Sequence, residues 1–267
     1  MKIAIFPNYE KAGTEKLLDD ILAILGTDAE CLVASDGVNE DDLYKTSDLI
    51  ITVGGDGTLI KHSKNASPYG KACLGVNTGR LGFLANVDGD KLDLLKRLAS
   101  GDYSVESRMM LWVSAVKNDE IVYEGTALND AVISSGSVAR ITDINMEISG
   151  DKIEYRADGI IISTPTGSTA YSMSAGGPII DPSVRCITVT PICSHSLTAR
   201  PILSAEDGVM KVSLSDTSRT HAFLTVDGER CCEVDHATKI IIKKSPFDAK
   251  FINLTGSTIY KTLSFKF

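Results

Sequence analysis

An apolar run passes into a glycine-rich loop at Ile50-Ile51-Thr52-Val53-Gly54-Gly55-Asp56-Gly57-Thr58-Leu59-Ile60. The β-branched residues before the loop predict a buried strand, and the residues after Gly57 predict a helix. Such a loop lies at the carboxyl end of a strand, where open α/β sheets bind their ligands. Glycines lack a Cβ atom and let backbone N–H groups approach phosphate oxygens at the start of a helix. The segment therefore predicts an anion site at one edge of a parallel sheet.

Strand and helix patterns alternate on both sides of this loop. The expected strands are 2–6, 29–34, 49–53 and 72–76, and the expected helices are 14–25, a helix after Gly57, and 91–99. Strands separated by helices form parallel sheets with right-handed crossovers and helices on both faces. Residues 1–100 are therefore predicted to form a three-layer α/β domain with a parallel sheet.

The character of the chain changes near residue 101, where β-type patterns and turn signals such as Asp227-Gly228 take over. The expected strands lie within 120–134, 143–148, 153–155, 159–163, 209–214, 221–226 and 239–243. A short helix is expected after Gly167. Residues 101–244 are therefore predicted to form a β-rich, sandwich-like second domain.

The overall composition is that of a globular protein, with 43% hydrophobic and 23% charged residues among 267. No apolar run reaches the roughly 18–20 residues needed to span a bilayer, and the first residues lack a signal-peptide pattern. Six cysteines without a secretory signal favour free thiols over a disulfide framework. The expectation is a soluble, cytoplasmic protein without a membrane partner.

Charge is unevenly distributed along the chain. Residues 1–60 carry 12 acidic and four basic side chains, and these account for the whole formal net charge of −8. Neither part forms the basic stripe with which duplex-binding proteins displace counterions, so nucleic acid is not an expected partner. An anionic ligand must instead be held by a few local donors or by a metal ion.

Asp56 is unusual inside a phosphate-binding loop because its carboxylate repels an anionic ligand. Two roles remove this difficulty: the carboxylate can accept a hydroxyl proton as a general base, or it can hold the Mg²⁺ that bridges phosphates. The alternative is purely structural, an Asp-Gly turn in which the aspartate caps the following helix.

A second polar segment runs from Arg156 to Pro178 and is dense in hydroxyl groups and glycines. A strand ends there, a short helix follows, and the helix stops at Gly176-Gly177-Pro178. Hydroxyls and backbone donors at a helix start suit the ribose and amide groups of a nucleotide, and Tyr171 offers a stacking face. The alternative is an ordinary helix capped by threonine and serine.

Two smaller features interrupt apolar runs. Asn129-Asp130 places an amide and a carboxylate inside a strand-like stretch, which destabilises the strand unless a turn or a ligand pairs with them. Asn77–Leu84 is a loop punctuated by glycines that follows a predicted buried strand. Taken together, the residues indicate a phosphate-handling, nucleotide-binding protein.

The chain resembles the bacterial NAD kinases in the order and spacing of four segments. These are Gly54–Thr58, Asn77–Leu84, Asn129-Asp130 and Arg156–Pro178, and the resemblance extends over Pro191–Pro201 and Leu224–Gly228. The glycine-aspartate loop alone is shared with lipid kinases and phosphofructokinases, whereas the hydroxyl-rich segment is specific to NAD kinases. The resemblance covers nearly the whole chain and is tightest over about residues 50–230.

This resemblance implies a kinase that transfers the γ-phosphoryl group of ATP, or a phosphoryl group of polyphosphate, to NAD. The acceptor would be the 2′-hydroxyl of the adenosine ribose, and the product NADP. It also implies Mg²⁺ as a divalent cofactor carried by the ATP phosphates, without a separate metal site. Family members are usually homodimers or homotetramers, and their C-terminal segment, here about 245–267, tends to return to the first domain.

The resemblance assigns roles to individual residues. Asp56 would be the base on the acceptor hydroxyl, with Gly57 contacting the same nucleotide. Asn129 and Asp130 would hold the adenine and its ribose, and Asp158 would bind the carboxamide side of the nicotinamide. The other residues implied at the NAD pocket are Arg140, Arg156, Thr166, Thr169, Ala170, Tyr171, Ser172, Met173 and Ser174. Those implied at the ATP phosphates are Gly54, Gly55, Gly57, Thr58 and Lys61.

Two other functions fit part of the pattern. A lipid or sugar kinase would share only the glycine-aspartate loop, and a lipid kinase should also show an exposed apolar docking surface, which the sequence does not mark. A non-catalytic NADP(H) sensor would bind the dinucleotide, but it would have no use for the charge of Asp56.

Overall fold

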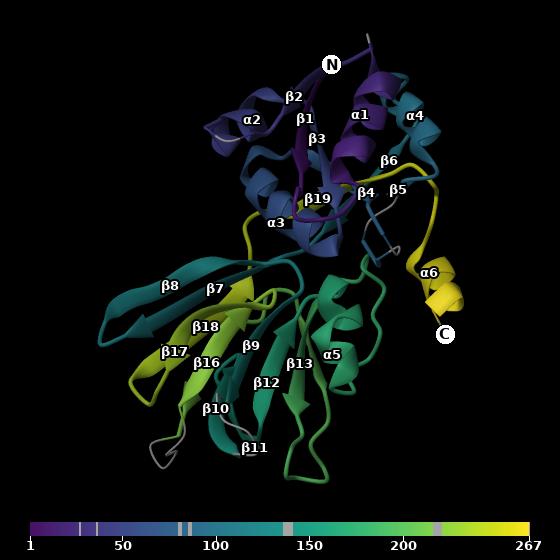
Figure 1. Cartoon of the computed structure of the whole chain (residues 1–267). Helices are drawn as coiled ribbons and strands as arrows, with labels where there is room; N and C mark the ends of the chain where they lie inside the picture. Colours follow the sequence, from purple (N-terminus) through teal and green to yellow (C-terminus); the bar gives the residue numbers. More distant parts are fainter. Residues whose placement is uncertain are drawn as a thin grey trace. The chain divides into compact units, whose positions relative to one another are not determined.

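The computed structural model describes residues 1–26, 28–35, 37–79, 82–84, 87–135, 141–215 and 221–266. The chain divides into two compact units, one of Met1–Arg108 with Phe247–Phe267 and one of Met109–Pro246 (Figure 1). The division falls after Arg108 and not near residue 100, because the strand Ser104–Arg108 pairs with Ala249–Asn253 in the first unit. Each unit has its own hydrophobic core.

A mostly parallel sheet forms the centre of the first unit. Its strands run in the order β2-β1-β3-β4-β19-β6, with β5 also paired to β4, and only β6 is antiparallel to its neighbour. The strands are β1 (Lys2–Pro7), β2 (Glu30–Val33), β3 (Leu49–Gly54), β4 (Ala72–Asn77), β5 (Val87–Asp88), β6 (Ser104–Arg108) and β19 (Ala249–Asn253). The expected parallel α/β sheet is therefore confirmed.

Helices cover both faces of this sheet, with α1 and α4 on one side and α2 and α3 on the other (Figure 1). The helices are α1 (Thr14–Leu25), α2 (Glu40–Thr46), α3 (Asp56–Ala66), α4 (Lys96–Ala99) and α6 (Ile259–Lys266), with 3₁₀ turns η1 (Ser67–Tyr69) and η2 (Leu92–Leu95). Alternation along β1 explains the layers, because Ile3 and Ile5 pack in the core with Ile21 of α1. Phe6 faces the other way and stacks on Tyr44 of α2.

The second unit contains two six-stranded antiparallel sheets, ordered β11-β10-β15-β18-β7-β8 and β14-β13-β12-β9-β16-β17. The strands are β7 (Leu111–Lys117), β8 (Glu120–Ala127), β9 (Asp130–Ser135), β10 (Thr142–Ile148), β11 (Asp151–Ala157), β12 (Gly159–Ser163), β13 (Cys186–Ile192), β14 (Ile202–Ala205), β15 (Met210–Leu214), β16 (Ala222–Val226), β17 (Glu229–Val234) and β18 (Thr238–Lys244). Residues of both sheets, such as Ile160 and Ile240, share one core. The expected sandwich is confirmed.

The outer face of the second of these sheets carries both apolar and hydroxyl side chains. Ile160 and Ile162 of β12 point into the core between the sheets, so Ile161 and Ser163 point to the opposite face. A short segment of η3 (Thr166–Thr169) and α5 (Tyr171–Ser174) packs on this sheet, where the Ser172 hydroxyl lies 3.0 Å from that of Thr190. This arrangement places the hydroxyl-rich segment over the ends of β9 and β12.

Several expectations about single elements are wrong. The expected strand 120–134 is two strands, β8 and β9, which belong to different sheets and meet at Leu128-Asn129. The expected helix 91–99 is the 3₁₀ turn η2 followed by one turn of α-helix. Strand β13 (Cys186–Ile192) is absent from the expected set. Strands β5, β6, β7, β14, β17 and β19 and helices α2 and α6 are also absent from it.

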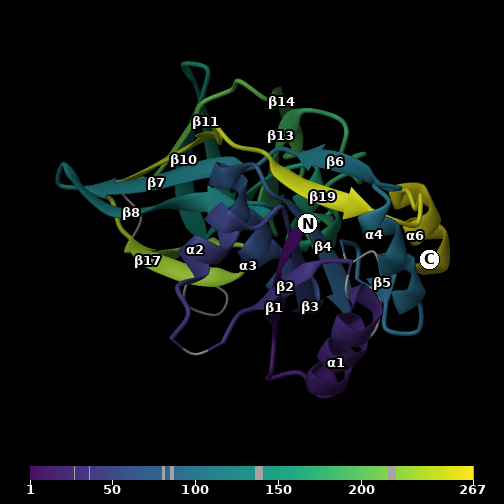
Figure 2. The same cartoon turned by 90° about the horizontal axis from the view of Figure 1, so that it is seen from above.

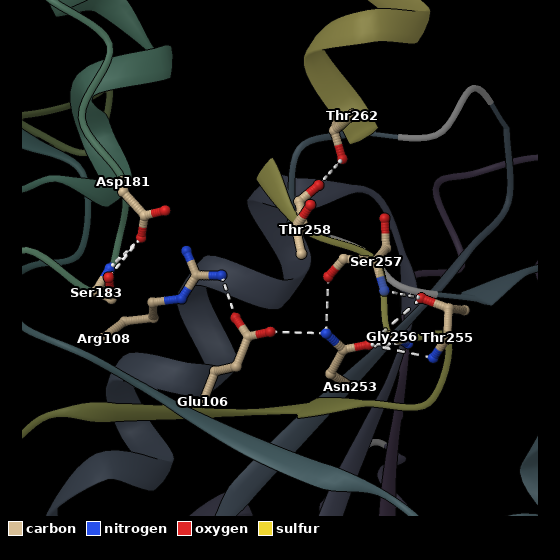
Figure 3. Close-up of polar contacts among 10 residues, drawn as sticks. All are labelled: Glu106, Arg108, Asp181, Ser183, Asn253, Thr255, Gly256, Ser257, Thr258 and Thr262. Atoms are coloured by element: carbon tan, nitrogen blue, oxygen red, sulfur yellow. Dashed lines mark hydrogen bonds and ion pairs between the residues drawn. The ribbon is translucent and has the colours of Figure 1, made fainter. Parts of the chain in front are cut away.

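The chain returns to the first unit through β19, which pairs with β4 on one side and β6 on the other (Figure 2). A turn held by the Asn253 side chain follows (Figure 3). Its Oδ1 atom accepts from the backbone N–H groups of Thr255 and Gly256, and its Nδ2 atom donates to the Glu106 carboxylate at 2.7 Å. Glu106 also pairs with Arg108. The returning strand is thus tied to β6 by side chains as well as by backbone.

Two findings bear on expectations from composition. All six cysteines are free thiols, as expected. Among the described residues, no helix has the length and apolar character required to cross a membrane.

Candidate functional site

The glycine loop lies where the strand order of the first sheet reverses direction. After β1 the chain connects to β2 on one side of the sheet, and after β3 it connects to β4 on the other side. The loops after β1 and β3 therefore flank the crevice in which open α/β sheets bind ligands. These two loops are bonded to each other: the Asn8 N–H donates to the Val53 carbonyl at 2.9 Å, and its side-chain amide donates to the Thr58 hydroxyl at 3.1 Å. Backbone and side-chain bonds of Asn8 thus tie the glycine loop to the loop after β1.

The glycines of this loop have different roles. A Cβ atom on Gly54 would lie 2.6 Å from the Thr58 hydroxyl, so this position must be glycine for the loop to close. A Cβ atom on Gly55 or Gly57 would meet nothing within 4 Å. The backbone at Gly55 and Gly57 is thus open to an approaching ligand. Lys61, one turn further along α3, is exposed.

Asp56 begins α3, and its carboxylate reaches a distant segment of the chain. Its two oxygens accept from the backbone N–H groups of Phe83 at 2.8 Å and Leu84 at 3.3 Å. The N-cap of α3 is Gly55, and no side chain caps this helix end. The capping alternative for Asp56 is therefore wrong, and the carboxylate is oriented by the segment that follows β4. This segment belongs to Asn77–Leu84, in which Arg80 and Leu81 lie outside the described residues.

A cavity of about 450 Å³ lies further along the same sheet edge, between α1 and the residues after β4 and β5. Three carboxylates, of Asp20, Asp88 and Asp90, line it together with one ammonium group, of Lys16. Their combined charge repels phosphate groups. The cavity is therefore a poor site for a triphosphate, and the glycine loop is the better anion site in the first unit.

In the second unit, the connection between β8 and β9 is clamped by Asp227. The Asp227 carboxylate accepts from the backbone N–H groups of Leu128 at 3.0 Å, Asn129 at 2.7 Å and Asp130 at 3.2 Å. The Asn129 carbonyl accepts from the Thr164 N–H at 2.9 Å. The backbone of Asn129 is thus held on both sides, whereas its side-chain amide makes no hydrogen bond to a described residue.

Asp130 begins β9 and is 4% exposed. Burial, with a smaller contribution from the Asp227 carboxylate, raises the pKa of Asp130 to about 7. Across the sheet Asp130 faces Ser163, whose buried hydroxyl has no hydrogen-bond partner among the described residues. The Thr166 hydroxyl is also buried and also has no hydrogen-bond partner among the described residues. Unpaired buried hydroxyls at one place indicate a polar ligand or ordered water.

The segment from Thr164 to Ser174 lies against the Asn129 backbone. Gly167 fits there only because it lacks a side chain, since a Cβ atom would lie 2.0 Å from the Asn129 carbonyl oxygen. Tyr171 is 46% exposed, so its ring is available to a ligand. The other predicted residues here range from buried to exposed: Ser172 is buried, Thr169, Ala170 and Met173 are partly exposed, and Ser174 is exposed.

Two further predicted residues lie on β11 and at its junction with β12. Asp158 joins β11 to β12, and its N–H donates to the Ile192 carbonyl at 3.0 Å. Arg156 is exposed and pairs with Asp143 on the neighbouring strand at 3.0 Å. Arg140 lies outside the described residues.

Two residues of these arrangements are missing from the predicted set, Asn8 and Asp227. Asn8 follows the first strand directly, and a polar side chain at that point is a usable signal. In the sequence, Asp227 is marked as part of an Asp-Gly turn and of the stretch Leu224–Gly228 to which the resemblance extends, without a role of its own. Its contacts with residues about 100 positions earlier have no local signal.

Comparisons with known proteins agree with this organisation. Residues 35–103 match the family described as ATP-NAD kinase N-terminal domain, and residues 128–254 match the ATP-NAD kinase C-terminal domain. The NAD kinase of Acetivibrio thermocellus is 40% identical over 276 residues, covering 98% of this chain and 96% of the relative. That of Geobacter sulfurreducens is 36% identical over 277 residues, covering 99% and 97%.

Solved structures show the same fold. An NAD kinase from Archaeoglobus fulgidus in complex with ATP superposes with a TM-score of 0.78 at 27% identity, covering 100% of this chain and 98% of that one. Yeast NADH kinase complexed with NADH has a TM-score of 0.86 at 22% identity, covering 99% and 85%, a likeness of fold. With both family domains matched and relatives 36–40% identical over almost the full length, this chain belongs to the NAD kinase family of enzymes.

Proposed function

We propose that this enzyme phosphorylates NAD, transferring the γ-phosphoryl group of ATP to the 2′-hydroxyl of the adenosine ribose and giving NADP. The observation that carries the proposal is the Asp56 carboxylate, placed at the start of α3 beside an open glycine loop and oriented by two backbone N–H groups. The relatives are named for action on NAD, and one solved neighbour holds ATP.

Asp56 acts in this proposal as the general base. A phosphoryl acceptor is a weak nucleophile until its hydroxyl proton is removed, and a positioned base typically contributes 10²–10⁴ in rate, about 3–5.5 kcal/mol of barrier. The bonds from Phe83 and Leu84 orient the carboxylate. The open backbone at Gly55 and Gly57 supplies N–H donors for the phosphates, and Thr58 and Lys61 are the flanking polar groups.

The acceptor is bound by the second unit. The free amide of Asn129 and the carboxyl group of Asp130 suit the amine of adenine and the ribose hydroxyls. The exposed ring of Tyr171 offers a stacking face, and Asp158 suits the nicotinamide carboxamide. The unpaired hydroxyls of Ser163 and Thr166 support a polar ligand at this place.

The chemistry of the donor set fits Mg²⁺ that arrives with ATP. Within the part of the chain that the structure describes, no three His, Cys, Asp or Glu side chains come together as a metal site. Mg²⁺ commonly takes one or two carboxylates, with phosphate oxygens and water completing its coordination, so Asp56 could supply such a ligand. When bound with ATP, Mg²⁺ neutralises charge on the phosphates.

A direct assay tests the proposal. Purified enzyme is supplied with Mg²⁺, one donor (ATP or polyphosphate) and one acceptor (NAD, NADH, diacylglycerol or fructose 6-phosphate), and each phosphorylated product is measured. We expect NADP from NAD and ATP. Product from the lipid or the sugar alone would contradict the proposal, and NAD binding without any turnover would indicate a sensor.

We further propose a homodimer or homotetramer, as the family resemblance implies. Sedimentation equilibrium measures the mass of the assembly against the 28.6 kDa chain. A monomer at all concentrations tested would contradict this proposal.

A further inference from the structure

The hydrogen bonds around Asn129 are unevenly distributed between backbone and side chain. Its N–H is taken by Asp227 at 2.7 Å and its carbonyl by the Thr164 N–H at 2.9 Å. Leu128 is held in the same way, its N–H by Asp227 and its carbonyl by the Thr164 hydroxyl. Only the side-chain amide of Asn129 stays unpaired among described residues. A backbone fixed on every side with a free polar tip is the arrangement expected of a recognition group.

The geometry of Asp227 is set by the hairpin between β16 and β17. Asp227 and Gly228 form its two-residue turn with φ of 48° and 83°, the left-handed conformations that such turns require. The Asp227 N–H donates to the Asp130 carbonyl at 2.9 Å, which extends the β9–β16 ladder to the turn itself. This pairing brings the carboxylate to face three successive N–H groups, a concave donor set that suits an anion.

The strength of this clamp follows from its charge. Hydrogen bonds to an ionised acceptor are roughly twice as strong as neutral ones. The three donors lie where the chain leaves β8 of one sheet and enters β9 of the other. An uncharged acceptor with a single oxygen cannot satisfy all three.

We propose that Asp227 is a positioning residue for dinucleotide recognition, which holds the Leu128–Asp130 backbone so that the Asn129 amide is aimed at the ligand before it binds. The inference rests on the proposed function, because it takes Asn129 to contact NAD. Asp227 itself touches backbone and not substrate in this proposal. Its effect on binding therefore passes through Asn129.

The variant Asp227→Asn isolates the charge and the second acceptor oxygen. Asparagine has the same shape and tolerates the left-handed backbone, so the hairpin turn is retained. The matched control is Asp235→Asn. Asp235 also accepts from side-chain and backbone donors in a turn of the same unit, those of Thr238 and Ala237, but it does not contact the Asn129 segment.

A double-mutant cycle is the test. NAD affinity is measured by calorimetry without a donor, and KM for NAD and for ATP in turnover, for Asp227→Asn, Asn129→Ala and the double variant. We expect each single variant to weaken NAD binding about tenfold or more with KM for ATP unchanged. The double variant should be no more than about threefold weaker than the worse single one, because both act through one contact. Asp235→Asn should leave NAD affinity unchanged.

Amide hydrogen exchange of the unmodified enzyme is a second test, and it needs no substitution. If the clamp is formed in advance, the amides of Leu128, Asn129 and Asp130 are protected before NAD is added. Free exchange that slows only with NAD would overturn the inference, as would additive effects in the cycle or an unchanged NAD affinity in Asp227→Asn. Absence of NADP formation by the unmodified enzyme would instead count against the proposed function. The NAD affinities of the single and double variants would still test the role of Asp227.

Discussion

Asp56 and Asp130 carry the same functional group in different surroundings. Asp56 lies at a helix start, partly exposed, with two backbone N–H groups on its oxygens. Asp130 is 4% exposed and lies near a second carboxylate, so its charged form is disfavoured. Burial thus raises the pKa of Asp130 to about 7, so that this carboxyl group is only partly ionised near neutral pH.

Replacing Asp56 with asparagine should remove the base and leave the acceptor site intact. We expect kcat to fall by about 10²–10⁴ while the affinity for NAD changes less than about twofold, because the base acts on the reacting proton. Steady-state kinetics and NAD titration measure the two quantities. The control is Asp20→Asn, a carboxylate of the same unit outside the glycine loop. A wild-type kcat in Asp56→Asn would show that another group takes the proton.

Asp130 makes stability depend on pH in a defined direction. The folded protein holds a proton on Asp130 up to about pH 7, whereas the unfolded chain releases it near 3.8. Folding therefore becomes less favourable as pH rises through this window. The free energy of unfolding of Asp130→Asn minus that of wild type should therefore be larger at pH 8 than at pH 5. The increase should be up to about 3 kcal/mol.

Urea unfolding of both proteins at pH 5 and pH 8 measures this difference. Asp235→Asn is the matched comparison, since the hydrogen bond from Lys117 lowers the pKa of Asp235 to about 2, below the tested range. Its destabilisation should be the same at both pH values. A difference between wild type and Asp130→Asn that does not change with pH would contradict the protonated state of Asp130.

At the scale of elements, the loop after β4 and the start of α3 form one structure. Gly82 approaches the Asp56 carboxylate so closely that a Cβ atom would lie 2.1 Å from either oxygen. The glycine is required by this contact between two segments and not by a turn. The position of the proposed base thus depends on a residue in another loop.

Gly82→Ala should displace the Asp56 carboxylate and lower kcat by at least about tenfold, because a misplacement of 1 Å can reduce a rate about 10²-fold. Gly79→Ala is the control in the same loop, since its added methyl group meets nothing within 4 Å. Turnover of the two variants is compared at equal folded concentration, checked by circular dichroism. Equal rates for both would mean that the Asp56 position does not limit turnover.

At the scale of the whole molecule, the first unit is discontinuous in sequence. The chain leaves it after Arg108 and returns after Pro246, and β19 then inserts between β4 and β6. Ile252 of this strand is fully buried in the same cluster as Ile51 and Leu74. The first unit therefore cannot complete its core without the last residues of the chain.

Ile252→Ala should destabilise the enzyme by about 2–5 kcal/mol, through lost apolar contacts and the cavity left behind. Ile121→Ala makes the same change at a side chain that is 64% exposed, and should alter stability by less than about 1 kcal/mol. Thermal and urea unfolding measure both. Similar losses in the two variants would contradict the placement of β19 in this core.

The sequence by itself determined the fold class and the chemistry of the candidate residues. Apolar periodicity identified α1, and short apolar runs identified β3 and β12, because both signals are local properties of the chain. The same information placed the glycine loop at a strand end. It could not separate β8 from β9, since an apolar run reads the same in one strand or in two that enter different sheets.

Tertiary structure alone decided which groups meet. The Asp56 carboxylate bonds to an N–H 27 residues away, and Asp227 to one 98 residues away. The unit boundary likewise depends on β19 joining a sheet whose other strands lie far earlier in the chain. Such partners are chosen by packing of distant segments, for which local periodicity carries no information, and so the clamp on Asn129 becomes visible only in the folded chain.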